Sequence, residues 1–428
     1  MALNENNDLN RQKVVIIGQG YVGLPLAMRC VKAGYFVVGF DIDEAKISNL
    51  KSGISPIDDV TDSEIATATS TGRYRPTAYE GDLRSFNVAL ITVPTPLLDS
   101  APDTSFIESA GKVLAKYLDR GSLVVLESTS YPGTTEELLA PILEMGSGLK
   151  CGEDFSLVFS PERIDPGNTS WTLQSTPKLI SGVDEQSLLK AKDFYEPLID
   201  QLIVASGVRE AEFAKLLENT YRQVNIALVN ELAIHAKSLG VDIWEVIRLA
   251  ATKPFGFAPF YPGPGVGGHC LPIDPEYLSW KFLKDFGESS KFIKLATSIN
   301  KKMPEYVVER VKTGLGNRGI SLRGSSVFVV GVSYKKNSSD MRESPAVETI
   351  SLLVENGARV TAFDAKAKIG HSVKFDLVKE LDLEIVKKSD IVLVLTNHDD
   401  VDYETILKYA RYVFDVRHCV SGENVEYL

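Results

Sequence analysis

The sequence predicts an α/β protein in which two Rossmann-like, doubly wound domains are joined by a central helical domain with a long helix. Three observations support this prediction. Apolar, strand-like runs alternate with helical stretches in the first half of the chain, an uninterrupted helical pattern covers 210–239, and a second strand–turn–helix pattern begins near Leu322. Strands that alternate with helices are typical of a parallel sheet with helices on both faces.

The composition is that of an ordinary globular protein. Of its 428 residues, 44% are hydrophobic and 24% are charged, and a chain of this length predicts two or three domains. We divide it into a disordered lead-in at 1–12, a first α/β domain at 13–206, a central helical domain at 207–314 and a second α/β domain at 315–428.

Charge and hydropathy exclude several classes of function. The formal net charge of −11 disfavours a nucleic-acid partner, because binding to a phosphate backbone needs a basic surface. No apolar run approaches the roughly 20 residues of a membrane-spanning helix, and the polar N-terminus lacks the apolar core of a signal peptide. We therefore expect a cytoplasmic protein that binds neither nucleic acid nor membrane. A small anionic ligand is still allowed, since it needs only a few local cations.

The first α/β domain opens with a pattern typical of dinucleotide binding. The apolar run 13–18 predicts a buried strand, and residues 18–23 fit GxGxxG at the start of a helical stretch. The next predicted strand, 35–41, ends in Asp41. The glycines allow the backbone to approach a pyrophosphate, and the acidic residue favours NAD over NADP because it binds ribose hydroxyls and repels a 2′-phosphate. The alternative is a glycine-rich turn without a ligand.

Hydroxyl-bearing residues follow two further predicted strands. The strand 88–93 leads into 92–96, which contains Thr95, and the strand 123–127 leads into Ser128 and Thr129. Ligands of open α/β sheets bind at the carboxyl ends of the strands. Either cluster alone is more often ordinary turn chemistry, but their shared place at strand ends favours a ligand site.

Charged residues near these strands are candidates for acid–base chemistry. Glu162 follows the predicted strand 157–159 and is suited to act as a general base, although a surface glutamate at a turn explains it equally well. Lys215 and Asn219 lie four residues apart in the helical pattern 210–239 and so share one face. A lysine there can stabilise an oxyanion, but the spacing alone favours a solvated lysine. A helix of this length commonly spans two domains or a dimer interface.

The loop 254–275, rich in Pro and Gly, is the most unusual stretch of the chain. It places Cys270 beside His269 and four residues before Asp274, where glycines permit close approach to a ligand. Of the four cysteines, Cys30, Cys151, Cys270 and Cys419, none forms a CxxC pair, so we expect reduced thiols and neither disulfides nor a metal site. For Cys270 we favour an activated nucleophile over a buried apolar cysteine.

The second α/β domain repeats the strand–turn pattern. Strands are predicted at 327–331, 359–364 and 391–395, as if this domain were a distant copy of the first. The segment from 331 to 345 contains Lys335 and Arg342 and is rich in hydrogen-bond donors, and Arg417 follows another strand. Phosphate binding and a solvated charged turn are equally good explanations.

Together these motifs resemble the UDP-glucose/GDP-mannose dehydrogenase family. The matching motifs occur in the family's order and span the chain from Lys13 to about Cys419. They are GxGYVG at 18–23, VPTP at 93–96, EST at 127–129, KLxxNTY at 215–221, GPGVGGHCLPIDP at 263–275 and DMRESPA at 340–346.

Within the family, the GGHC run is similar to the UDP-N-acetylhexosamine branch, because UDP-glucose enzymes usually carry Ser before the cysteine. The segments 253–257 and 260–263 resemble UDP-N-acetylglucosamine 6-dehydrogenases most. UDP-N-acetylmannosamine and UDP-glucose 6-dehydrogenases are the alternatives. The chain departs from the family's pattern at two places. Ser130-Tyr131 replaces a frequent Val-Pro, and Pro254 stands where family members often have an Arg that lies near the substrate of the neighbouring subunit.

The resemblance implies three sets of residues and no metal. The catalytic set is Thr129, Glu162, Lys215, Asn219, Cys270 and Asp274. The NAD-binding set is Gly18, Gly20, Tyr21, Val22, Gly23, Asp41, Lys46, Thr95, Ser128, Thr129 and Arg342. The substrate-binding set is Glu162, Arg163, Lys215, Asn219, Tyr261, Gly263, Gly265, Lys335 and Arg417.

The resemblance also implies a twofold oxidation of the sugar C6 alcohol to a carboxylate, in a homodimer or higher homo-oligomer that uses two NAD. Lys215, or a water held by Thr129 or Asp274, would remove the alcohol proton. Cys270 would form a thiohemiacetal and then a thioester, which a water helped by Glu162 and Asp274 would hydrolyse. Single-step β-hydroxyacid dehydrogenases share the GxGxxG and Lys-xxx-Asn motifs, and a nucleotide-binding sensor is the non-enzymatic alternative.

Overall fold

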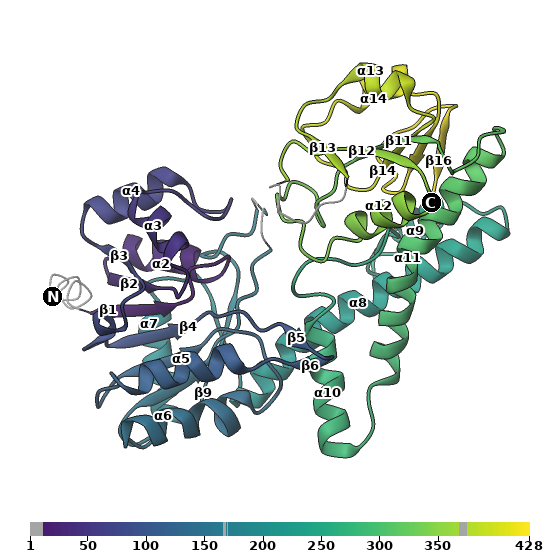
Figure 1. Ribbon diagram of the computed structural model, residues 1–428. Helices are drawn as coiled ribbons and strands as arrows, with labels where there is room; N and C mark the ends of the chain where they lie inside the picture. The colour runs from purple at the N-terminus through teal and green to yellow at the C-terminus, as the bar shows by residue number, and fades with distance from the viewer. Residues whose placement is uncertain (1–11, 166–167, 169, 368–374) are drawn as a thin grey trace. The chain divides into compact units, whose positions relative to one another are not determined.

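The computed structural model describes residues 12–165, 168, 170–367 and 375–428. The expected disordered lead-in at 1–12 lies outside these residues, except for Gln12. Contacts divide the chain into two compact units (Figure 1). The first comprises Met1–Glu218 and Glu276–Glu288, and the second comprises Asn219–Pro275 and Ser289–Leu428. Among the described residues, no helix is both long enough and apolar enough to cross a membrane.

The first unit is built on a sheet with the strand order β10-β9-β8-β7-β4-β1-β2-β3 in the described chain. From β3 to β8 the strands are parallel and follow the 3-2-1-4-5-6 order of a Rossmann domain, whereas β9 runs antiparallel to β8. The strands are β1 Lys13–Ile17, β2 Phe36–Phe40, β3 Tyr74–Thr77, β4 Val88–Ile91, β7 Leu123–Leu126, β8 Ser156–Phe159, β9 Lys178–Gly182 and β10 Leu202–Val204, with a hairpin of β5 Leu97–Leu98 and β6 Ala101–Pro102.

Helices cover both faces of this sheet. Alternate residues of a strand point to opposite faces, so Val14 packs into one core and Val15 into the other. The first core contains residues of α2, α3, α4 and α7, and the second contains residues of α5, η2 and α6. These elements are α2 Gly23–Lys32, α3 Glu44–Lys51, α4 Asp62–Ser70, η1 Glu80–Leu83, α5 Ser105–Ala115, η2 Thr134–Leu139, α6 Ala140–Ser147 and α7 Glu185–Tyr195.

The predicted long helix is α8, Val208–Ser238, whose 31 residues span about 46 Å. Gly240 follows it with φ of +69°, as a C-terminal glycine does. The chain passes from the first unit to the second within this helix. The other central helices are α9 Ile243–Ala250, α10 Asp274–Phe286 and α11 Lys291–Gly316.

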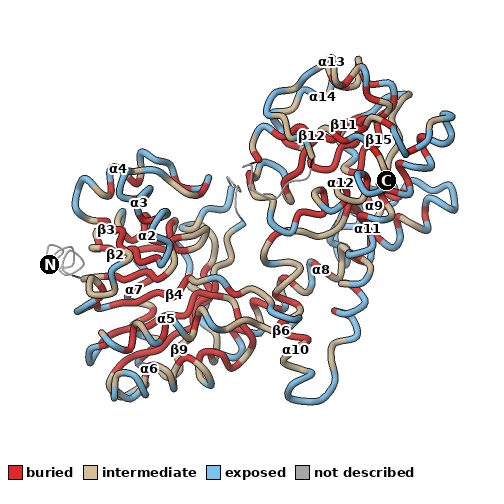
Figure 2. Tube along the Cα trace, viewed as in Figure 1, coloured by how far each residue is buried: buried red, intermediate tan, exposed pale blue. Residues whose placement is uncertain are grey.

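The second unit contains a parallel sheet with the strand order β13-β12-β11-β14-β15-β16, again 3-2-1-4-5-6, as seen in the described residues. Its strands are β11 Ser326–Val330, β12 Arg359–Phe363, β13 Asp376–Val378, β14 Ile391–Val394, β15 Val413–Asp415 and β16 Val425–Tyr427. Residues of α11 and α12 (Pro345–Glu355) pack on one face, and those of α13 (Leu383–Lys388) and α14 (Tyr403–Tyr409) on the other. In both units the central strands are buried (Figure 2). The predicted fold class is confirmed.

Candidate active site

The turn at 18–23 joins β1 to α2 and fits a dinucleotide. Gly18 has φ of +96°, and a Cβ on it would lie 2.7 Å from the carbonyl oxygen of Thr92. A Cβ on Gly23 would lie 1.9 Å from the carbonyl oxygen of Gly18. At Gly20 a Cβ would meet nothing within 4 Å, so its backbone is open to a ligand. The N-cap residue of α2, Val22, makes no side-chain cap hydrogen bond, so the first N–H groups of this helix can bind a pyrophosphate. Tyr21 and Val22, both half-buried, complete the turn.

Asp41 follows β2 and is placed to bind the adenosine ribose. It is buried, and its Oδ2 accepts a hydrogen bond from the N–H of Gln19 at 2.9 Å. The ammonium of Lys46, on α3, lies 2.7 Å from the same oxygen. A carboxylate at this point accepts ribose hydroxyls and repels a 2′-phosphate. The residues present therefore fit NAD.

The two hydroxyl clusters lie at neighbouring strand ends, because β4 and β7 are paired in parallel. Ser128 donates its hydroxyl to the carbonyl of Val93 at 2.8 Å, which ties the two turns together. Thr129, the next residue, is half-buried. Thr95 is buried, and its carbonyl accepts a hydrogen bond from the hydroxyl of Tyr277 on α10. This edge of the sheet is thus fixed by hydrogen bonds that the sequence motifs do not reveal.

Glu162 and Arg163 follow β8 and are both engaged. Oε1 of Glu162 accepts the N–H groups of Arg163 at 2.6 Å and Ile164 at 2.8 Å. The guanidinium of Arg163 pairs with Glu218 of α8 at 2.6 Å and donates to the carbonyl of Pro177 at 3.1 Å. A substrate group that uses Arg163 must therefore share it with Glu218.

Lys215 and Asn219 are both buried on α8, at 8% and 5% exposure. The interpretation of Lys215 as a solvated lysine, which the spacing alone favours, is therefore wrong. In the second unit, the side-chain amide of Asn219 donates to Oδ2 of Asp274 at 2.6 Å. Asp274 is itself 3% exposed. A buried amide thus holds a buried carboxylate in one orientation.

Cys270 is an exposed residue that lies just before α10. Its carbonyl accepts the N–H groups of Ile273 at 3.2 Å and Asp274 at 2.9 Å, so a helical turn begins at the cysteine. Negative charge that develops beside this turn lies near the positive end of the helix dipole. Burial lowers the pKa of His269, so its imidazole is neutral at pH 7, and no hydrogen-bond partner for its Nε2 is found among the described residues.

The glycine loop is pressed against the second α/β domain. Gly268 has φ of +83°, and a Cβ on it would lie 2.7 Å from the ring of Tyr334. The N–H of Gly263 donates to Oδ1 of Asn230 on α8 at 2.9 Å, and a Cβ on Gly263 would lie 2.8 Å from the guanidinium of Arg417. The expected substrate residues Gly263 and Arg417, 154 positions apart in the chain, therefore meet.

The remaining expected residues are placed as follows. Gly265 has φ of +130°. Tyr261 is 52% exposed and stacks on Trp244 with ring centroids 5.6 Å apart. Lys335 is half-buried next to Tyr334. Arg342 is exposed and forms a two-pronged ion pair with Asp340, with N–O distances from 2.7 to 3.1 Å. A cofactor phosphate that uses Arg342 would compete with this carboxylate.

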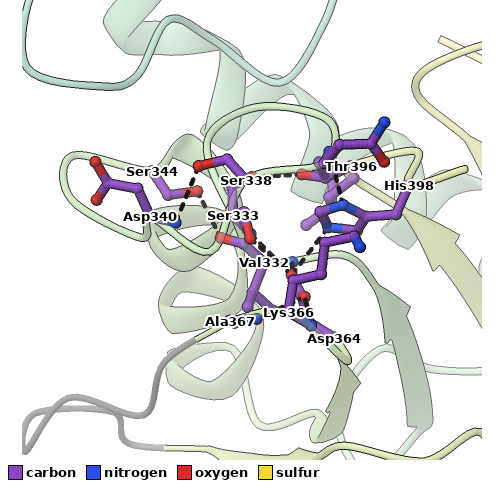
Figure 3. A network of polar contacts seen from close by, with 12 residues as sticks. Val332, Ser333, Ser338, Asp340, Ser344, Asp364, Lys366, Ala367, Thr396 and His398 are labelled. Atoms are coloured by element: carbon purple, nitrogen blue, oxygen red, sulfur yellow. Dashed lines mark hydrogen bonds and ion pairs between the residues drawn. The ribbon is translucent and has the colours of Figure 1, made fainter. Parts of the chain in front are cut away.

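The second α/β domain has an internal counterpart of Asp41, shown in Figure 3. Asp364 follows β12, and its Oδ2 accepts the N–H of Val332 at 2.9 Å and the hydroxyl of Ser333 at 2.9 Å. Nε2 of His398 lies 3.1 Å from the same oxygen. Nδ1 of His398 accepts the N–H of Asn337, so Nε2 carries the proton and donates to Asp364. The Asp364 carboxylate is thus occupied by internal hydrogen bonds, whereas among the described residues Asp41 accepts a side-chain hydrogen bond from Lys46.

Several residues around the site gave no signal in the sequence. Asn230 and Tyr334 hold the glycine loop, and Lys178 lies behind Glu162 with its Nζ 3.6 Å from Oε2. A lone lysine or asparagine in a helix or strand is usually a surface residue. Pairs that are distant in the chain can be found only from the fold.

The two Rossmann-type sheets, the glycine turn that precedes Asp41 and the exposed cysteine of the glycine loop define an NAD-dependent dehydrogenase. Three domain models of one family match the chain: the NAD binding domain at 12–199, the central domain at 209–302 and the UDP binding domain at 328–422. The chain belongs to the UDP-glucose/GDP-mannose dehydrogenase family, and it is an oxidoreductase that uses NAD.

The chain is similar to relatives that are named for two different substrates. The UDP-N-acetyl-D-glucosamine 6-dehydrogenase of Pseudomonas aeruginosa is 38% identical over 354 residues, which cover 82% of each protein. The UDP-N-acetyl-D-mannosamine dehydrogenase of Pyrococcus horikoshii is 34% identical over 422 residues, covering 97% of this chain and 98% of that protein. A solved structure of the Pyrococcus horikoshii enzyme superimposes with a TM-score of 0.87 at 33% identity, and covers 97% of this chain and 98% of the other.

Proposed function

We propose that this enzyme oxidises the C6 alcohol of a UDP-N-acetylhexosamine to the carboxylate in two steps, through a covalent intermediate on Cys270. The observation that carries the proposal is the exposed Cys270 at the start of a helical turn, four residues before the buried Asp274 that Asn219 orients. A nucleophilic thiol lets one site complete both oxidations without releasing the aldehyde.

Each group of the chain has a role in this chemistry. NAD, when bound, accepts one hydride in each oxidation. Lys215 removes the alcohol proton, with a water held by Thr129 or Asp274 as the alternative base. The thiolate of Cys270 adds to the aldehyde carbon, and Lys215 and Asn219 stabilise the resulting oxyanion.

The second oxidation converts this thiohemiacetal into a thioester. Glu162 accepts a proton from a water molecule, with Asp274 as the alternative acceptor, and the oxygen of this water attacks the thioester carbon. The carbon–sulfur bond breaks, which releases the carboxylate and restores the thiol.

UDP-N-acetylglucosamine is the substrate that we favour. The 38% identity to the Pseudomonas aeruginosa enzyme supports it, together with the segments 253–257 and 260–263. UDP-N-acetylmannosamine is the second candidate, because the relative with that name matches almost the whole chain. We propose that Tyr261, Gly263, Gly265, Lys335 and Arg417 bind the nucleotide sugar and that Arg342 binds the cofactor.

We also propose that the chain forms a homodimer through α8. Three residues of α8 and the residue directly after it are 46% to 78% exposed and are spaced by seven, four and seven residues, so they form one stripe along the helix and its end: Tyr221, Leu228, Leu232 and Leu239. An apolar stripe of this kind on a protein surface usually marks an interface.

The test is the number of NADH formed per sugar with a panel of UDP-sugars. We expect two NADH from the preferred UDP-N-acetylhexosamine, and loss of carboxylate formation in Cys270→Ala. Cys151→Ala, a change at a thiol in the first unit, is the control and should keep the ratio of two. A ratio of one would indicate a single-step dehydrogenase, and NAD binding without turnover on any UDP-sugar would indicate a sensor.

A further inference from the structure

A buried cluster of charged groups lies behind Glu162 in the first unit. Lys178, the first residue of β9, is 4% exposed, and its Nζ lies 2.8 Å from Oε2 of Glu127 and 3.6 Å from Oε2 of Glu162. Tyr195 of α7 donates its hydroxyl to Oε1 of Glu127, and its ring centroid is 5.2 Å from the ammonium. One buried ammonium therefore serves two carboxylates from neighbouring strand ends.

The two carboxylates are held in different ways. Glu127 is 1% exposed, and both of its oxygens accept a hydrogen bond, one from Lys178 and one from Tyr195. Glu162 uses Oε1 for two backbone N–H groups, and its buried Oε2 has no hydrogen-bond partner among the described residues. Lys178 is therefore anchored by Glu127 and acts on Glu162 through its charge.

Burial of three ionisable side chains is costly unless their charges are matched. A positive charge a few ångströms from a partly buried carboxyl group favours the ionised form of that group. The cluster thus has the properties needed to keep Glu162 as a base.

We propose that Lys178 is a positioning residue that keeps Glu162 ionised and oriented for hydrolysis of the thioester. This inference rests on the proposed function, in which Glu162 accepts the proton of the attacking water. Other ionisable groups around the cluster belong to α2, α7, α8 and the segment after β8. They are Cys30, Tyr195, Glu218 and Arg163.

Two substitutions should shift the pH dependence of hydrolysis in opposite directions. Lys178→Met removes the ammonium, so the acid limb of the kcat–pH profile should move to higher pH by about one unit or more. Glu127→Gln removes the competing carboxylate and leaves Glu162 as the remaining ion-pair partner of Lys178 among the described residues, so the acid limb should move to lower pH. If the cluster only held β7, β8 and β9 together, both changes would lower stability and leave the acid limb in place, which would overturn the proposal.

The hydrolysis step can be observed directly on the full-length enzyme. At a pH one unit or more below the wild-type acid limb, hydrolysis in Lys178→Met should be at least tenfold slower. A burst of two NADH per subunit should then precede a slow steady state, and intact-protein mass spectrometry should show a sugar-nucleotide adduct on Cys270. Lys178→Arg keeps the charge and should restore most of the wild-type rate. If Lys178→Met does not fold, the Glu127→Gln profile and the Lys178→Arg rate still decide the question, because an unshifted limb or a tenfold loss in Lys178→Arg contradicts the role of charge.

A double substitution separates an effect through Glu162 from a general loss of stability. When Lys178→Met is added to Glu162→Gln, hydrolysis should slow by less than twofold further, because the base is already absent. Leu198→Ala is the control, since Leu198 is fully buried in the core beside α7. It should lower Tm and leave the acid limb unchanged.

The outcomes also separate this inference from the proposed function. If Glu162→Gln hydrolyses the thioester at the wild-type rate, Glu162 is not the base and this inference fails, whereas two NADH per sugar and the loss of carboxylate formation in Cys270→Ala would still support the twofold oxidation through Cys270. If Glu162→Gln is slow but Lys178→Met has a normal rate and pH profile, only the role of Lys178 is wrong.

Discussion

Asn219 donates a hydrogen bond of 2.6 Å to Asp274, which joins the long helix α8 to the first residue of α10. The chain passes from one compact unit to the other directly before Asn219 and one residue after Asp274. Both side chains are buried, so this hydrogen bond satisfies a polar group on each of them. This pair therefore combines a proposed catalytic role with a structural one.

The charge of this pair can be tested with Asn219→Asp. Two carboxylates would then face each other, and we expect kcat to fall by about 100-fold and stability to fall by about 1–3 kcal/mol at pH 8. Stability should partly recover at pH 5, because a protonated carboxyl group can donate to its neighbour. Urea denaturation and kcat at both pH values provide the measurements. Asn225→Asp, on the same helix, is the control, and an equal loss there would contradict a specific role for the pair.

Asp41 should determine the choice of cofactor. In Asp41→Asn the repulsion of a 2′-phosphate is lost and a strong acceptor for the ribose becomes weaker. We expect kcat/KM for NAD to fall by about tenfold, or about 1.4 kcal/mol, and the preference for NAD over NADP to narrow. The ratio of the two kcat/KM values is the measurement. Glu44→Gln, an exposed acidic residue at the start of α3, should leave this ratio unchanged.

Gly268 should tolerate no side chain. Its φ of +83° strains any other residue, and a Cβ would lie 2.7 Å from Tyr334. We expect Gly268→Ala to lower stability by about 1–3 kcal/mol and to raise KM for the UDP-sugar. Thermal denaturation and steady-state kinetics test this. At Gly316, in the last turn of α11, a Cβ would meet nothing within 4 Å, so Gly316→Ala should be neutral or slightly stabilising.

Glu212 should make stability depend on pH. On α8 it accepts hydrogen bonds from the N–H of Gly133 at 2.6 Å and of Thr135 at 2.9 Å, and from the hydroxyl of Thr135 at 2.7 Å. Burial nevertheless raises the pKa of Glu212 from 4.5 to about 7. The folded protein thus binds this proton more tightly than the unfolded chain, so its contribution to stability is present below pH 4.5 and is lost as pH rises through 7.

The corresponding variant is Glu212→Gln, which cannot ionise. Between pH 4.5 and 8 the wild type should lose up to about 3 kcal/mol relative to this variant, at 1.36 kcal/mol per pH unit. Denaturation midpoints measured across this range give the difference. Glu210→Gln changes an exposed glutamate in the same helical turn and should show no such trend. Parallel pH curves for wild type and Glu212→Gln would refute the explanation.

The stripe on α8 should control assembly. Leu232 is 46% exposed at its centre, and a charge there would have to be desolvated in an interface. We expect Leu232→Glu to convert a dimer into a monomer, as measured by sedimentation velocity. Leu189→Glu places the same charge at a leucine of α7 that is 53% exposed, and it should leave the mass unchanged. A dimeric Leu232→Glu would show that this stripe is not the interface.

The local patterns of the chain predicted most of the architecture. Apolar runs such as 13–18 and 391–395 became the buried strands β1 and β14, and the uninterrupted helical pattern became α8. The short strands β3, β10, β13 and β16 were missed, because a run of three or four residues is too short to carry a clear periodic signal. The antiparallel direction of β9 was also missed, since the direction of a strand is set by the strands that it pairs with and not by its composition.

The sequence by itself determined the classes of group that the site contains: a glycine turn, an acidic residue at a strand end, a thiol in a glycine loop, and a lysine and an asparagine on one helical face. Only the tertiary structure decided which of them interact. Asn219 and Asp274 are 55 residues apart, and Glu127 and Lys178 are 51 apart. Burial and pairing depend on groups that the fold brings together from such distances, so local residue types cannot report them. Lys178, for example, belongs to none of the sequence motifs, although in the structure it lies in a buried charged cluster.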